Sequence, residues 1–185
     1  MKHLSFILLA VIIFASACSE SSSPSNKKIE ILPLEIGNKW EYKISSEGEI
    51  KDMTTMVFKD TIINNERWFD FGCLLMINRE DGLWLRYYDD KTNKWEEELR
   101  YKYPAVAGEQ YSDSLDLVKV IAINEKVTVP AGTFNCYVYR IPLFEDNYMD
   151  YYLCPGVGNI KTVSYENWNG HEIYEYQILQ SYSLK

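Results

Sequence analysis

Apolar and polar residues alternate in several segments of this chain, and this alternation restricts the fold more than any other feature. It occurs in residues 40–45 (WEYKIS), 95–101 (WEEELRY) and 174–178 (YEYQI). Successive side chains of a β-strand point to opposite faces, so a period of two indicates strands of a half-buried antiparallel sheet. Aromatic residues make up 15% of the chain, and they favour strands over helices. We therefore predict an all-β fold.

Turn-forming residues separate the strand-like segments, for example at 81–82 (DG), 146–147 (DN) and 169–170 (NG). Asn-Gly is a strong hairpin signal because both residues tolerate positive φ. We expect about eleven strands within residues 39–184, at a spacing of roughly 13 residues. That spacing suits hairpins and is short for parallel strands, which need long crossover connections. The pattern predicts an antiparallel meander.

Two further turns are interpreted as architecture and not as ligand loops. Pro130 presets φ at the first corner of a turn, and Gly132 can adopt the left-handed conformation that closes a bulged hairpin. Pro155 and Gly156 suit a type II turn. For the first turn, we expect Gly132→Val to lower the unfolding midpoint and to leave any ligand affinity nearly unchanged.

The first 17 residues are typical of a signal peptide. A short positive start is followed by the apolar run 4–14 and by the small residues 15–17 (ASA). The apolar run is too short to span a bilayer, which needs roughly 20 residues. The triplet with Cys18 resembles the lipobox of bacterial lipoproteins, which implies a diacylglyceryl group on Cys18 and attachment to a membrane. The same triplet also suits ordinary signal peptidase, which would expose Cys18 without lipid.

Composition divides the remaining chain into a tether and a domain. Residues 19–28 (SESSSPSNKK) lack aromatic residues and cannot bury enough apolar surface to fold alone. We therefore predict a lipoprotein signal peptide over 1–17, a lipidated cysteine and flexible tether over 18–28, and a single β domain over 29–185. The 27 acidic and 19 basic residues give a net charge of −8, which argues against nucleic acid as a partner.

Three motifs resemble a group of Gram-negative envelope lipoproteins of unknown function. They are residues 32–40, which contain LPL and GNKW, residues 127–134 (VTVPAGTF) and residues 151–161 (YYLCPGVGNIK). Those lipoproteins are similar to the LolA/LolB-like lipoprotein carriers, whose antiparallel sheet forms an open half-barrel around an apolar hollow. The resemblance implies that fold and no shared catalytic residues. The residues after the cysteine are Ser19 and Glu20, and not the aspartate that signals inner-membrane retention. The resemblance therefore also implies an outer-membrane anchor, with the domain facing the periplasm or the cell surface.

Residues that commonly carry catalysis or bind metals are sparse. His171 is the only histidine after the signal peptide and follows a predicted turn, so we interpret it as an exposed polar residue. Asp89, Asp90 and Asn93 lack the glycine and final glutamate of a calcium loop, and a solvated turn is the simpler interpretation. We predict no catalytic residue, no metal site and no cofactor.

The cysteines permit one disulfide. Cys136 and Cys154 lie equally far from a predicted turn near residue 145, so they can face each other across a hairpin. An exported compartment allows the bond. The alternative is that both are small buried residues, as we expect for Cys73.

Four aromatic residues flank one predicted hairpin, namely Trp84, Tyr87, Tyr88 and Trp95. They can belong to the core, form a platform for sugar rings, or line the hollow of a half-barrel. The leading hypothesis is a non-enzymatic, lipid-anchored envelope protein that binds a lipid or other hydrophobic ligand, or an envelope protein partner. The alternatives are a glycan-binding module or carboxylate-based glycosidase, and a structural subunit of an envelope assembly.

Overall fold

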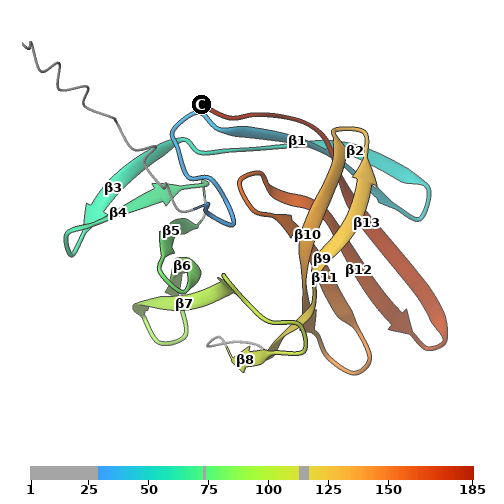
Figure 1. The fold of residues 1–185 in the computed structure, drawn as a ribbon. Coiled ribbons are helices and arrows are strands. Elements are labelled where there is room, and N and C mark those ends of the chain that lie inside the picture. Colours follow the sequence, from blue (N-terminus) through green and yellow to red (C-terminus); the bar gives the residue numbers. More distant parts are fainter. Residues whose placement is uncertain (1–28, 73, 113–116) are drawn as a thin grey trace, which may run out of the picture.

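The computed structural model describes residues 29–72, 74–112 and 117–185, and within these ranges the chain forms thirteen strands (Figure 1). The predicted signal peptide, Cys18, the tether and Cys73 lie outside the described residues. In the described ranges, no helix has the length and apolar character needed to cross a membrane. All strand pairs are antiparallel, which confirms the predicted all-β class.

The larger sheet has eight strands in the order β2-β1-β13-β12-β11-β10-β9-β8. These are β1 (Lys39–Ser46), β2 (Glu49–Met56), β8 (Gln110–Ser112), β9 (Leu117–Val129), β10 (Gly132–Pro142), β11 (Tyr148–Cys154), β12 (Gly158–Trp168) and β13 (His171–Ser183). The first and last strands pair with each other along their length, from Lys39 opposite Ser183 to Ser46 opposite Glu175. The two ends of the chain therefore meet within this sheet, one strand in from the β2 edge, and β2 and β8 are its edge strands.

The smaller sheet is a five-stranded meander in chain order, inserted between β2 and β8. Its strands are β3 (Lys59–Ile63), β4 (Glu66–Asp70), β5 (Leu75–Arg79), β6 (Gly82–Asp89) and β7 (Lys94–Lys102). Figure 1 shows the two sheets curving around a common interior, with β1 and β2 across the top, as an open half-barrel. The spacing predicts about eleven strands, and the difference arises because short strands such as β8, with three residues, carry too little alternation to be recognised.

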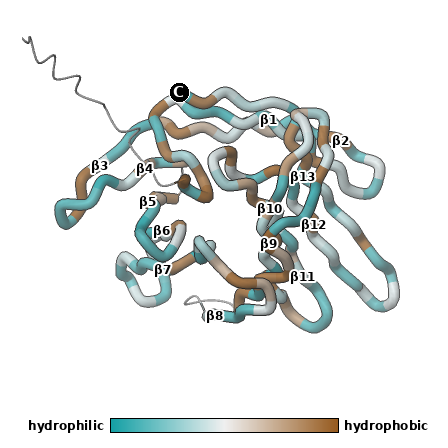
Figure 2. The backbone as a smooth tube through the Cα atoms, in the orientation of Figure 1, coloured by the Kyte–Doolittle hydropathy of each residue, from teal (hydrophilic) through white to brown (hydrophobic). Residues whose placement is uncertain are grey.

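Two clusters of buried side chains join the sheets. One contains Leu83 and Tyr101 from the smaller sheet with Tyr139 and Leu153 from the larger one. The other brings Phe69 of β4 against residues of the larger sheet, which include Trp40, Cys136 and Leu179. Hydrophobic and hydrophilic stretches are interspersed along both sheets in Figure 2. Each sheet thus buries one face against the other.

The three motifs found in the sequence meet in the second cluster. The Trp40 indole donates a hydrogen bond of 2.6 Å to the Val157 carbonyl oxygen. Leu32 packs so close to Gly158 that an added Cβ would lie 2.5 Å from its Cδ1. Phe134, from the motif at residues 127–134, packs against the same cluster. These motifs therefore have a structural role in joining distant parts of the chain.

The two proline turns connect neighbouring strands. Pro130 lies in the two-residue loop between β9 and β10, where Gly132 pairs with Val129. Pro155 and Gly156 lie between β11 and β12, and this turn is closed by a 3.0 Å hydrogen bond from the Val157 amide to the Cys154 carbonyl oxygen.

Candidate functional site

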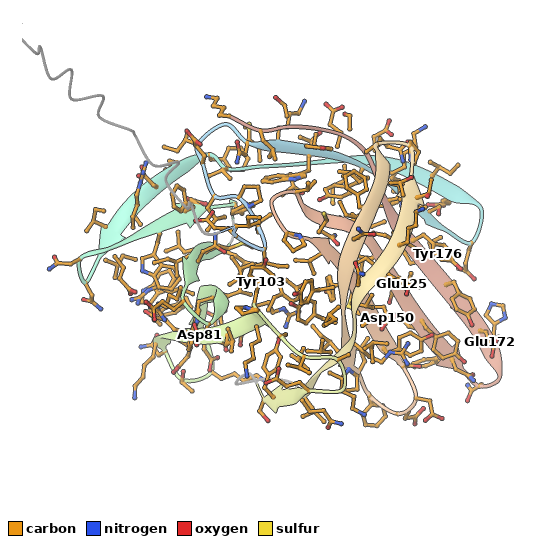
Figure 3. All side chains as sticks on the ribbon, in the orientation of Figure 1. Asp81, Tyr103, Glu125, Asp150, Glu172 and Tyr176 are labelled. Atoms are coloured by element: carbon orange, nitrogen blue, oxygen red, sulfur yellow. The ribbon has the colours of Figure 1, made fainter. Side chains whose placement is uncertain are left out.

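A cavity of about 270 Å³ lies in the interior of the half-barrel and is partly open to solvent. Both sheets contribute to its wall, and side chains from the two sheets converge on the interior in Figure 3. Its apolar lining includes Leu32, Phe71, Met76, Leu83, Leu85 and Leu153. We refer to this cavity as the hollow. A predominantly apolar concave site with a few polar groups is typical of ligand-binding pockets.

Trp40 and Tyr42 line the hollow because of the alternation along β1. Their polar groups donate to backbone carbonyl oxygens at the start of β12: the Trp40 indole to Val157, and the Tyr42 hydroxyl to Asn159 at 3.0 Å. Burial raises the pKa of the Tyr42 phenol above its ordinary value. These bonds anchor both rings, so the wall that they form is rigid.

Tyrosine rings from both sheets form another part of the wall. The Tyr101 ring lies 5.1 Å from that of Tyr139 and 5.6 Å from that of Tyr151, measured between centroids. The Tyr139 hydroxyl donates a 2.6 Å hydrogen bond to the Lys102 carbonyl oxygen, which ties the larger sheet to β7. Burial, above all, raises the pKa of Tyr101 well beyond its usual range, so this phenol stays neutral.

Few polar side chains reach the hollow. Arg100 is the one charged residue among the described residues that line it, and its guanidinium lies 5.9 Å from the Tyr101 ring and 5.8 Å from the Tyr151 ring. The Asn159 amide nitrogen donates to the Thr162 hydroxyl at 2.9 Å. Its buried Oδ1 has no hydrogen-bond partner within the described part of the chain. The hollow is therefore apolar with one cationic group.

The four aromatics singled out in the sequence do not line the hollow. By strand register Trp84 and Tyr88 share a face with Trp95, whereas Tyr87 lies on the opposite face with Leu85. Tyr88 and Trp95 are exposed, at 44% and 53%, and their rings meet edge to face with centroids 5.5 Å apart. The structure thus separates an exposed ring pair from the rings of the hollow.

The outer face of the smaller sheet is covered by an arginine network. Arg79 stacks between Trp68 and Trp84, with its guanidinium 5.2 Å and 4.7 Å from their rings. It also donates to Glu66 at 2.9 Å and 2.7 Å and to Glu97 at 2.8 Å. The hydrogen bonds that Arg79 donates to Glu66 are the main reason that the pKa of Arg79 is raised. We interpret this network as reinforcement of the sheet.

The remaining candidate residues are separate from the hollow. His171 is exposed, with its Nε2 3.4 Å from Glu47 Oε1, and Asp89 accepts the Lys91 amide within its own turn. Among the described residues, no group of three His, Cys, Asp or Glu side chains is placed to hold a metal ion. Cys136 and Cys154 occupy the positions next to the Tyr137–Leu153 pair but are unbonded in the structure, and their disulfide stays a prediction.

Sequence reasoning missed the rings of the hollow, although a signal for some of them exists. Trp40 and Tyr42 belong to the clearest alternating segment of the chain, and the inward face of such a strand is the face that can line an interior. Arg100 had no such signal, because its alternation with Tyr101 predicts that the two side chains point to opposite faces.

Comparison with known proteins finds a likeness in fold alone. No protein-family model matches the chain, and no curated protein does. A candidate lipoprotein from Parabacteroides distasonis has a similar solved structure, with a TM-score of 0.53, 15% identity, and coverage of 84% of this chain and 99% of that one. A candidate exported protein with a YmcC-like fold from Bacteroides fragilis has a TM-score of 0.46 and 13% identity, with coverage of 84% and 100%. The first likeness shows a shared fold.

Proposed function

We propose that this protein is a non-enzymatic envelope lipoprotein that binds a hydrophobic ligand in the hollow. The observation that carries the proposal is the partly open cavity of about 270 Å³, whose wall combines leucine side chains with the anchored rings of Trp40 and Tyr42. Binding suits this lining better than catalysis does, because its few polar side chains, such as Arg100 and Asn159, include no carboxylate, histidine or cysteine among the described residues.

The proposed location is the outer membrane, through lipid on Cys18, with the domain facing the periplasm or the cell surface. The lipobox-like residues before Cys18 support it. The description of the Parabacteroides distasonis protein as a candidate lipoprotein agrees with it. Labelling cells with radioactive palmitate tests the anchor, and loss of label in Cys18→Ser is expected. Equal labelling of both chains would refute lipidation at this cysteine.

Hydrophobic binding is tested with a neutral apolar fluorescent probe, N-phenylnaphthylamine. The full chain carrying Cys18→Ser is suitable, because residues 15–17 also suit ordinary signal peptidase and detergent is then unnecessary. Met76→Trp fills part of the hollow and should weaken probe binding by about tenfold or more, since about two methylene equivalents of contact are lost. Ile62→Trp is the matched control, because Ile62 is 65% exposed on β3.

The result depends on the difference between these two variants. Unfolding midpoints of both variants are measured alongside, because added volume in a packed region can cost stability. If Met76→Trp folds and binds the probe as tightly as Ile62→Trp does, the ligand is not in the hollow. If the unmodified hollow binds no apolar probe, the proposed function is wrong.

A second candidate function is glycan binding by the exposed pair Tyr88 and Trp95. The observation in its favour is that both rings are about half exposed on the outer face of the smaller sheet, with the Arg86 guanidinium 5.4 Å from the Trp95 ring. A glycan array screened with Trp95→Ala as the control tests it. Signals that are absent, or that survive this substitution, would contradict a site at this pair.

A further inference from the structure

We propose that the hollow holds one straight hydrocarbon chain of about nine carbon atoms, so that its ligand is a single-chain amphiphile and not a lipid with two or more chains. This inference rests on the proposed function and specifies the ligand class of the same site. Three observations carry it, namely the way in which burial changes across the lining, the ring pairs that bound the hollow, and its volume.

Burial of the lining residues follows their polarity. The fully buried residues of the lining are all apolar or aromatic, and Trp40, Leu83 and Leu153 are the most buried, with 1%, 1% and 2% exposed. The polar residues of the lining, such as Thr55 and Gln177, are only half-buried. The hollow therefore has an apolar floor, and its polar groups lie nearer to solvent. A ligand that matches this arrangement has an apolar tail at the floor and a polar end near the opening.

Two ring pairs join the sheets and limit the width of the hollow. Tyr101 of the smaller sheet and Tyr151 of the larger sheet both line it, with ring centroids 5.6 Å apart. Phe71, which follows β4, also lines it and stacks on Trp40 of β1 at 6.2 Å. The two pairs belong to different buried clusters, so the hollow is the space left between these clusters. The sheets cannot move apart without breaking these ring contacts, so the width of the hollow is fixed.

The volume of the hollow sets the length of the tail. A water molecule occupies about 30 Å³ of the liquid and a methylene group is of similar size, so 270 Å³ holds about nine such groups. The volume is also slightly below the roughly 300 to 1,000 Å³ found for pockets that bind drug-sized ligands. One chain of medium length fills this space, and a second chain on the same ligand would remain outside.

The first test varies chain length alone. Straight-chain alcohols from hexanol to dodecanol, each below its solubility limit, displace N-phenylnaphthylamine from the full chain carrying Cys18→Ser. These alcohols are neutral and share one head group, so charge has no part in the comparison. Each added methylene group should strengthen binding about fourfold until the alcohol has about nine carbons. Longer alcohols should gain little, because their additional carbons stay in water.

The second test varies the number of chains. Monooctanoylglycerol and dioctanoylglycerol carry the same chain on a glycerol head group, once in the first and twice in the second. Both should displace the probe with affinities that agree within about twofold, because only one chain enters the hollow at a time. A gain of about tenfold or more from the second chain would refute the single-chain assignment.

Variants locate the chain in the hollow. Leu85→Ala enlarges the hollow by about three methyl-sized groups, so the fourfold gains should continue to correspondingly longer alcohols. Ile141→Ala is the matched control, because Ile141 is 1% exposed and loses as many carbon atoms but is not among the described residues that line the hollow. It should lower stability and leave the length limit unchanged. Leu85→Val should shift the limit by about one carbon, and it replaces Leu85→Ala if that variant does not fold.

Each outcome separates this inference from the proposed function. A steady gain up to dodecanol, or no displacement of a bound probe by any alcohol, would refute the inference and leave hydrophobic binding intact. Failure of the unmodified hollow to bind the probe would refute the proposed function and this inference together. A length limit that is the same in folded Leu85→Ala or Leu85→Val as in the parent chain would overturn the inference, because the chain would then lie elsewhere.

Discussion

Replacing Gly82 by Ala tests how tightly β6 is fitted against β7. Gly82 has a φ of +144°, and a Cβ at this position would lie 2.2 Å from the Tyr101 carbonyl oxygen and 2.8 Å from the Tyr103 amide nitrogen. Real Cβ atoms do not approach other atoms this closely. Both neighbours are backbone atoms, so the clash is relieved only if the two strands move apart.

Gly132 is a control with nearly the same φ and a different environment. Its φ is +141°, and its added Cβ would meet only the Phe134 ring, at 3.4 Å from Cζ and 3.5 Å from Cε2. A residue with a side chain in this region costs roughly 1 to 3 kcal/mol. The Gly132→Ala change should therefore lower the free energy of unfolding by that amount alone.

Gly82→Ala carries the same backbone cost plus that of overpacking, which is typically another 1 to 3 kcal/mol. The expected total of roughly 2 to 6 kcal/mol is a large part of the 5 to 15 kcal/mol by which a domain is stable. Urea unfolding followed by tryptophan fluorescence measures both variants. Equal losses at Gly82 and Gly132 would refute the steric argument, because their φ values are nearly the same.

Three further predictions concern charged and thiol groups. Asp150→Asn should lower the free energy of unfolding by roughly 1 to 3 kcal/mol, because the amide keeps one acceptor oxygen but loses the negative charge and one of the two 2.7 Å hydrogen bonds from Arg140. The loss is less than for a fully buried pair, since 35% of the Arg140 side chain is exposed. An unchanged urea midpoint would contradict this. A hydrogen bond from Arg79 lowers the pKa of Glu66, so the stability that it contributes is complete above the ordinary value of 4.5 and is lost as the pH falls through the lowered value. Glu66→Gln should therefore flatten the acid side of a pH–stability curve, and an identical slope would refute the assignment. Burial raises the pKa of the Cys136 thiol to about 12, so peptide mass spectrometry should find it alkylated only after unfolding, and rapid labelling of the folded protein would contradict this.

Much of the fold follows from patterns within short segments. The alternation in residues 40–45 and 174–178 predicts strands, and the structure has β1 and β13 there. The turn residues at 169–170 lie between β12 and β13, as a hairpin signal indicates. These features could be predicted because side-chain direction and turn geometry depend on adjacent residues.

The pairing of strands and the site were not predictable in the same way. Nothing in the alternation of residues 40–45 indicates that β1 pairs with β13, which lies at the other end of the chain. Alternation also predicts that Arg100 points away from the hollow, and a bulge opposite Leu83 and Trp84 reverses this. The sequence suggested Tyr88 and Trp95 as possible ligand-binding residues, but both rings are exposed in the structure. The number of aromatic residues in a segment does not indicate which face of the strand is enclosed.

The amino-acid sequence by itself determined that this chain is built of antiparallel strands joined by tight turns, and it indicated the signal peptide and Cys18, because each of these depends on neighbouring residues. Only the tertiary structure decided which faces enclose a hollow and which residues line it. The hydrogen bond that anchors Trp40 joins it to Val157, 117 residues away, and contacts at such separations depend on the packing of the whole chain. Local patterns specify the faces of each strand, whereas the burial of apolar surface between two sheets selects the face that lines the interior.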